Sequence, residues 1–236
     1  MGGLRSTRRE WLKLAGGALG AGAGLHRVPG FAQGPQFRDA DRTTDRIVAL
    51  VRTFADTDPK LVRYVQKIEP LEFRIPEVKV KPEELPVMDY FVGDLHLRYS
   101  FDDPRFVSNV NSTDLRRLKL KRDELLPLAV SNFRRLYPNL KIERPLPALA
   151  SVTNGGELEP CLMLDTQYWE AERKRVDSQI VAAVPARDAL IYTNRSSPQN
   201  LVALRRVVAD RYAAAGKNSL SKWLFLWNYS YWEVLT

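Results

Sequence analysis

Polar residues near two predicted turns form the first set that could do chemistry. The set contains Asn154, Glu157 and Glu159, around an Asn-Gly-Gly turn signal, together with Arg187 and Asp188, which follow a proline. If the two turns are neighbours, Arg187 can make a fork-shaped contact with Glu159 or Asp188, or hold a ligand carboxylate or a sugar. The alternative is structural: an ion pair of Arg187 would tie the proline turn to its neighbours.

Asp94, His96 and Arg98 alternate along a predicted strand and form the second set. Alternate residues of a strand share a face, so three ionisable groups would stand in a row, as general acid–base catalysis can use. The solvent face of any antiparallel strand has the same pattern. Cys161 lies in an apolar segment with no neighbour that would activate a thiolate, which indicates a buried, inert thiol.

The count of metal ligands argues against a metal centre. The whole chain has two histidines and one cysteine, whereas tetrahedral zinc and iron–sulfur sites need several such ligands. Carboxylates could still hold calcium or magnesium, but the spacing of a calcium loop is not found in the sequence. We therefore expect no metal and no other cofactor.

The end of the sequence is rich in aromatic residues. Three of the five tryptophans, Trp223, Trp227 and Trp232, stand in its last fourteen positions. Exposed rings could stack on a sugar or dock a protein partner. The alternative is that they form part of the hydrophobic core.

The N-terminal residues resemble an export signal. Thr7-Arg8-Arg9-Glu10-Trp11-Leu12-Lys13 fits the bacterial twin-arginine pattern, with a weakly apolar run at 14–25 that is too short to span a bilayer. Small residues precede a predicted signal-peptidase site after Ala32. The sequence therefore predicts a periplasmic protein that meets the twin-arginine translocase and signal peptidase during export.

The charge balance says little about nucleic acid. Half of the net charge of +8 comes from residues 1–32, so the predicted mature chain is only mildly basic. That excess is too weak to indicate nucleic-acid binding. No second hydrophobic run is long enough for a stable membrane span.

Residue patterns predict an α+β fold of antiparallel strands and hairpins with several packed helices. In the first half we expect a helix at 42–55, extended segments in the proline-rich stretch 58–86, one strand at 90–101, a turn, and a second strand at 106–110. A helix cap at Asn111 and a helix near 121–137 follow.

The second half alternates in the same way. We expect an extended segment at 141–153, a strand returning from the Asn-Gly-Gly turn at 157–165, a short helix at 166–174, strands at 179–184 and 189–193, a helix at 198–215, and a strand-like aromatic end. Adjacent strands are joined too tightly for parallel crossovers.

Several stretches resemble the bacterial domain-of-unknown-function family 1444, the YtpQ-like proteins. N-G-G-E-L-E-P-C-L-M-L-D at 154–165, Trp169 in the next helix and V-P-A-R-D at 184–188 are similar to motifs of that family. The resemblance covers roughly residues 90–236 and supplies no activity or catalytic residue. From the residue patterns together with this resemblance, we expect three parts: the signal at 1–32, an N-terminal helix with a proline-rich segment at 33–86, and the α+β domain at 87–236, which resembles the family.

The sequence is most consistent with an uncharacterised exported protein that acts as a non-enzymatic binding or assembly factor. The alternative is a small hydrolase, without cofactor or dependent on carboxylates, with its site near the Arg187-Asp188 turn. Convergence of the two polar sets in one pocket would favour the enzyme.

Overall fold

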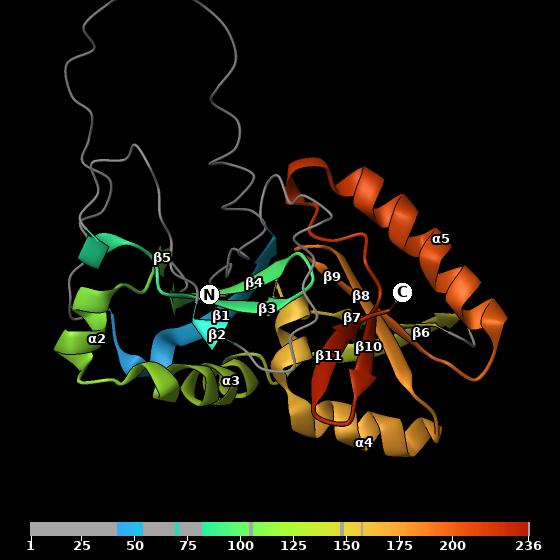
Figure 1. Ribbon diagram of the computed structural model, residues 1–236, viewed down its shortest axis with the longest axis horizontal. Coiled ribbons are helices and arrows are strands. Elements are labelled where there is room, and N and C mark those ends of the chain that lie inside the picture. Colours follow the sequence, from blue (N-terminus) through green and yellow to red (C-terminus); the bar gives the residue numbers. More distant parts are fainter. Residues whose placement is uncertain are drawn as a thin grey trace, which may run out of the picture.

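Two antiparallel sheets with packed helices form the protein, which confirms the predicted α+β class (Figure 1). The computed structural model describes residues 42–53, 69–70, 82–103, 106–146, 149–156 and 158–235. The predicted export signal, with Arg8 and Arg9, lies outside the described residues, as does most of the proline-rich segment. Among the described helices none is long and apolar enough to cross a membrane.

The first sheet has the strand order β1-β4-β3-β2, and β5 pairs with the far end of β4. Its strands are β1 (Ile47–Thr53), β2 (Glu69–Pro70), β3 (Met88–Val92), β4 (Leu95–Asp103) and β5 (Phe106–Asn109). Short 3-10 helices lie at η2 (Thr44–Arg46) and η4 (Pro82–Glu84). All neighbouring strands of this sheet are antiparallel.

The predicted helix at 42–55 is wrong, because its described part forms η2 and β1. Residues 47–51 are buried without exception, and β1 pairs with β4 along its whole length. In an uninterrupted apolar run, residues at helical spacing such as Ile47, Leu50 and Val51 are apolar whatever the structure. The spacing alone therefore could not distinguish a helix from a buried strand. Three of the five residues are β-branched, and such side chains favour strands.

The predicted strand at 90–101 is a hairpin of two strands. The chain reverses at Gly93-Asp94, where Gly93 has φ +60°, and β3 and β4 pair on either side of the turn. A left-handed φ is readily adopted only by glycine. β4 therefore begins at Leu95 and extends through Asp102 and Asp103, two residues past the predicted end of the strand.

Two helices follow the first sheet. Asn111 caps α2 (Ser112–Leu118) through a capping box in which its side chain accepts from the Asp114 amide and Asp114 accepts from the Asn111 amide. After η5 (Arg122–Glu124) comes α3 (Leu125–Leu136), which confirms the helix predicted near 121–137. Its buried stripe of Leu125, Ala129 and Phe133 covers one face of the first sheet.

The second sheet has the order β11-β10-β8-β9-β7-β6 and confirms the hairpin predicted from the strands at 179–184 and 189–193. Its strands are β6 (Lys141–Leu146), β7 (Leu149–Thr153), β8 (Ile180–Ala186), β9 (Ala189–Asn194), β10 (Phe225–Asn228) and β11 (Tyr231–Val234). The helices α4 (Thr166–Val176) and α5 (Pro198–Ala215) fall where they were predicted, and η7 (Gly216–Asn218) follows α5.

The strand predicted at 157–165 is wrong, because the described residues 159–164 form the 3-10 helix η6 (Glu159–Leu164). The strand that returns alongside β7 is β9, not the next segment of the chain. Two buried indoles hold η6 in place: Trp169 Nε1 donates to the Leu162 carbonyl at 2.7 Å and Trp232 Nε1 donates to the Met163 carbonyl at 2.9 Å.

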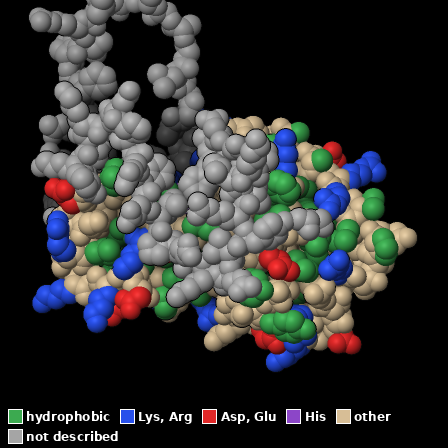
Figure 2. Space-filling view, viewed as in Figure 1, with side chains coloured by type: hydrophobic (Ala, Val, Ile, Leu, Met, Phe, Trp, Pro, Cys, Tyr) green, Lys and Arg blue, Asp and Glu red, His purple; other side chains and the backbone are tan. Residues whose placement is uncertain are grey.

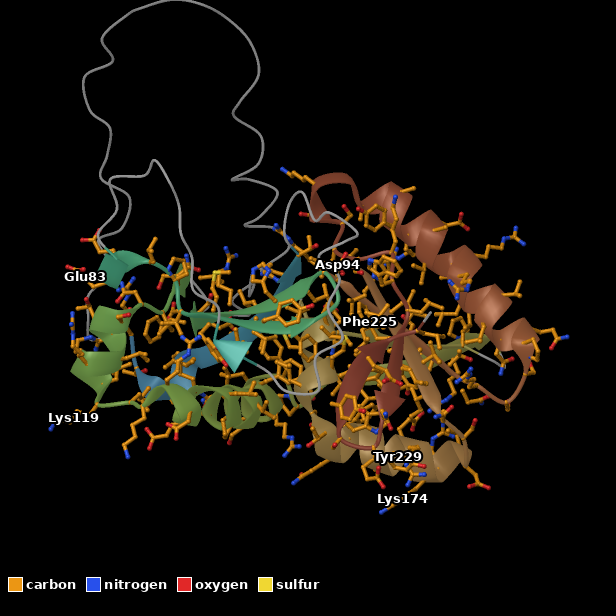
Figure 3. The ribbon with its side chains drawn as sticks, viewed as in Figure 1. Glu83, Asp94, Lys119, Lys174, Phe225 and Tyr229 are labelled. Carbon is orange, nitrogen blue, oxygen red and sulfur yellow. The ribbon has the colours of Figure 1, made fainter. Side chains whose placement is uncertain are left out.

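The two sheets meet at a continuous core. η6 packs against β1, and the tip of the β3–β4 hairpin packs against β10 and β11. Figure 3 shows this junction, with Asp94 at the hairpin tip and Phe225 beside it in the centre of the molecule. A side of the second sheet away from this core is covered by α5, through Leu204 and Val208.

Candidate functional site

Arg98 and Arg187 come from different sheets and lie close enough at the junction for the charge of Arg187 to lower the pKa of Arg98. Arg98 stands on β4, opposite Leu50 and Met88, and Arg187 occupies the turn between β8 and β9. The Arg187 amide donates to the Asn218 carbonyl at 3.0 Å, which fixes the turn against η7. Both side chains are half-buried.

The two guanidinium groups lack a carboxylate partner among the described residues. Neither forms an ion pair there, and the Nε of each is buried without a hydrogen-bond acceptor. Burial lowers the pKa of Arg98, and the positive charge of Arg187 lowers it further. Like charges that repel each other in a partly dry site would gain from an anion placed between them.

His96 and Arg52 extend this cationic group along the same face of the first sheet. The two residues are directly opposite each other on β4 and β1, and His96 is buried. Burial, with the charges of Arg98 and Arg52, lowers the pKa of His96 to about 4. His96 is therefore neutral at pH 7. We refer to Arg52, Arg98 and Arg187, together with the neutral His96 among them, as the cationic cluster.

Asp94 does not join His96 and Arg98 in the row that the sequence predicted. It occupies the β3–β4 turn, where its Oδ1 is buried without a hydrogen-bond partner among the described residues. Burial raises the pKa of Asp94 to about 6, and the nearby Ser221 side chain offsets part of that rise. None of the groups that shift its pKa belongs to the cationic cluster, so Asp94 and His96 form two separate environments.

Ser221 is itself locked in the core. Its side chain is fully buried, its amide donates to the Val184 carbonyl at 3.1 Å, and its hydroxyl accepts from the Trp223 amide at 3.1 Å. The segment before β10 is thus held to the end of β8. Ser221 links the hairpin tip of the first sheet to the second sheet.

The remaining residues of the first predicted set are scattered. Asn154 is exposed with φ 70°, and its Nδ2 donates to the Asn139 carbonyl at 2.8 Å. Asp188 is exposed, while Glu159 is buried and accepts from the Gly155 amide at 2.9 Å. Glu157 lies outside the described residues.

The predicted structural ion pair of Arg187 is wrong. Among the described residues neither Glu159 nor Asp188 pairs with it. Glu159 instead turns back onto the Asn-Gly-Gly loop that precedes it, because η6 follows the loop directly where a strand was expected. Arg187 meets Arg98 because β8 and β9 adjoin the first sheet at their turn.

Cys161 is buried within η6, not on a strand. Burial raises the pKa of its thiol to about 11, which a hydrogen bond to Val51 only partly offsets. Such a thiol stays protonated at neutral pH, in agreement with the predicted inert cysteine.

The predicted partner surface of tryptophans is wrong for two of its three members. Trp227 and Trp232 are 1% and 3% exposed, and Trp223 is half-buried. Trp169, Trp227, Trp232 and Tyr192 form a chain of ring contacts, with centroids 4.9 to 5.2 Å apart between neighbours. The alternating pattern of the final hairpin points these indoles into the core.

Sequence reasoning did not find a second polar cluster, around Glu172. This buried carboxylate accepts from Arg175 at 2.7 Å, Tyr192 at 2.9 Å and Arg144 at 3.1 Å. The bonds from the two arginines lower the pKa of Glu172 against its burial. The adjoining cavity is only ≈ 40 Å³, room for a few waters. Both arginines already pair with Glu172, so the cluster joins α4 to the sheet.

Sequence reasoning also did not find Arg52 and Ser221 as members of the junction. Arg52 follows an apolar run, and only the pairing of β1 with β4 places it opposite His96. No group of three or more metal-ligating side chains occurs in the described parts of the chain. No protein-family model, curated protein or solved structure matches the sequence, and the resemblance to family 1444 stays a prediction.

Proposed function

We propose that the protein is a non-enzymatic binding factor that holds an oxyanion of its ligand or partner, a carboxylate or a phosphate, between Arg98 and Arg187. The observation that supports it most is that two half-buried guanidinium groups, close enough for their charges to interact, have no acid as partner among the described residues. A guanidinium binds such anions through two parallel hydrogen bonds.

The cluster differs from a generally basic surface. On the face seen in Figure 2, the Lys and Arg side chains of the described residues are scattered over both ends of the molecule. The cationic cluster instead joins β1, β4 and the β8–β9 turn, so two sheets fix the distance between its charges. Such preorganisation favours a compact anionic group over a long polyanion.

The hydrolase alternative has less support. Asp94 and His96 face different neighbours, so they do not form an acid–base pair. The two nucleophile candidates near the junction are Ser221, which is fully buried, and Cys161, whose thiol is buried and protonated. Binding requires none of these groups to react.

Thermal unfolding in succinate or phosphate tests the proposal, with sodium chloride at equal ionic strength as the reference. Either anion should raise the melting temperature of the parent, by a free energy of about 2.7 kcal/mol at a hundred times Kd. Arg187→Gln should lose this gain and melt no lower than the parent, because it removes a like-charge repulsion. The exposed Arg205→Gln on α5 changes the net charge equally and should keep the gain.

Equal gains in the parent and Arg187→Gln would contradict the anion site. A strong fall in the melting temperature of Arg187→Gln without ligand would also contradict it, since that would indicate a hidden structural role for the guanidinium.

We further propose export through the twin-arginine route, on the sequence pattern at residues 7–13. Replacing Arg8 and Arg9 with lysine keeps the charge and should retain the protein in the cytoplasm of fractionated cells. Periplasmic protein at the parental level would contradict this route.

A further inference from the structure

A groove separate from the cationic cluster lies between α4 and the β10–β11 turn. Its volume is ≈ 550 Å³, enough for one or two sugar rings. Figure 3 shows Tyr229 and Lys174 beside each other at this edge of the molecule. Most of the lining residues have polar side chains, but the surface they present to the groove is mostly apolar: they are Thr166, Gln167, Glu170, Ala171, Lys174, Tyr229 and Ser230.

Tyr229 is placed here at a cost to the backbone. It is 66% exposed and has φ 57°, in the first position of the two-residue turn that joins β10 to β11. Hairpins of this length favour glycine or asparagine in that position, because other side chains are strained at positive φ. A bulky ring that is both strained and exposed is not explained by packing, and such outliers gather at functional sites.

The ring is held in a fixed orientation from one side. The Arg173 guanidinium lies 5.1 Å from the centre of the Tyr229 ring. Arg173 in turn donates to both carboxylate oxygens of Glu170, at 2.9 and 3.2 Å, and Lys174 lies 3.7 Å from the same carboxylate. A platform held in this way loses little side-chain entropy when a ligand stacks on it.

We infer that this groove binds a neutral saccharide, with a sugar ring stacked on Tyr229. Aromatic rings offer a flat apolar face for the C–H groups of a sugar. The hydroxyl and amide groups of Thr166, Gln167 and Ser230 are hydrogen-bond donors and acceptors that suit sugar hydroxyls. Glu170 is already paired with Arg173 and Lys174, so its carboxylate is not free to hold a cation. The one positive charge in excess is shared with the exposed Lys174, which stays solvated, so a neutral ligand suits the groove.

A protein partner fits this surface less well. Protein-docking patches usually expose several hundred Å² of contiguous apolar surface. Among the described residues the other exposed large hydrophobic side chains are Val107 and Val202, on β5 and α5, so Tyr229 stands alone. The inference is independent of the oxyanion proposal, since the two sites share no residue.

Calorimetric titration of the full chain with maltotetraose, cellotetraose and chitotetraose tests the inference. At least one should bind, with saturation-transfer NMR showing contact through the sugar C–H protons. Tyr229→Asn should weaken that binding about tenfold and melt no lower than the parent, because asparagine tolerates positive φ. Tyr229→Phe keeps the ring and should bind like the parent, as should Val202→Ala on α5.

Failure of all three saccharides to bind would overturn the inference. So would an unchanged affinity in Tyr229→Asn. Neither result would bear on the oxyanion site, because succinate and phosphate are tested by their own response and by Arg187→Gln.

Discussion

Asp94 and His96 are both buried and stand two positions apart in the sequence. Burial raises the pKa of Asp94 and lowers the pKa of His96. The pKa of Asp94 is raised by burial to about 6, so Asp94 stabilises the fold least above pH 6 and more as the pH falls toward its unfolded value near 3.8. The pKa of His96 is lowered to about 4, so its contribution is complete above pH 6.5 and is lost as the pH falls. Each effect amounts to about 3 kcal/mol.

Asp94→Asn should therefore leave only the effect of His96, which is a loss of stability as the pH falls. At pH 7 the variant should be more stable than the parent, by up to about 3 kcal/mol, because it removes the cost of a buried charge. Between pH 6.5 and 4 it should lose stability more steeply than the parent, in which the two effects oppose each other. Urea denaturation at half-unit pH steps measures both.

His96→Gln is the converse variant. It should gain stability as the pH falls from 6.5 to 4, because only the Asp94 effect is left. Parallel pH profiles for parent, Asp94→Asn and His96→Gln would show that neither group titrates as its burial requires.

At the scale of elements, α2 depends on its cap. It spans only Ser112–Leu118 and buries little apolar surface, so the capping box of Asn111 and Asp114 has a large share in fixing its start. Asn111→Ala should cost about 1 kcal/mol of unfolding free energy. Asn111→Asp, which can still accept from the Asp114 amide, should cost less. Chemical denaturation measures both, and an Asn111→Ala variant as stable as the parent would show that the start of α2 is set by packing.

The elements that could be predicted from sequence are those with a local signal. α5 has Pro198 at its start and Gly216 after its end, and the β8–β9 hairpin has two apolar runs around one turn. β1 and η6 were missed because their structure depends on distant partners. β1 is buried by β4 and α3, and η6 is held by the indoles of Trp169 and Trp232.

The candidate site was predictable only in part, for the same reason. Arg98 and Arg187 were both identified from the sequence as candidate site residues, but they were not predicted to be neighbours. Their proximity depends on how the two sheets pack, and the spacing of residues along the sequence does not predict that packing. Tyr229 was not predicted as a site residue. The alternating pattern of its hairpin identifies the buried tryptophans, but it carries no signal for a residue in the turn.

At the scale of the whole molecule, the junction of the sheets depends on Gly93. A Cβ there would stand 3.0 Å from Val234 Cγ2 and 3.1 Å from Phe225 Cε1, and the residue has φ +60°. Gly93→Ala should lower stability by about 2–5 kcal/mol, from backbone strain and overpacking together. Gly156 is the matched control, because it has φ +58° with nothing within 4 Å of its Cβ position.

Gly156→Ala should therefore cost only the strain, about 1–2 kcal/mol. Thermal unfolding of both variants separates the packing contribution from the backbone contribution. Equal losses would mean that the hairpin tip can move away from β10 and β11 without penalty.

The position of Cys161 has a practical consequence. Its thiol is buried where η6 packs on β1, beside Val51, and the sequence contains no other cysteine. A thiol-specific alkylating reagent can reach this sulfur only when η6 moves away from β1. The rate at which the intact protein gains the mass of the reagent then reports how often that opening occurs, and it can be measured in a cell extract without changing the sequence.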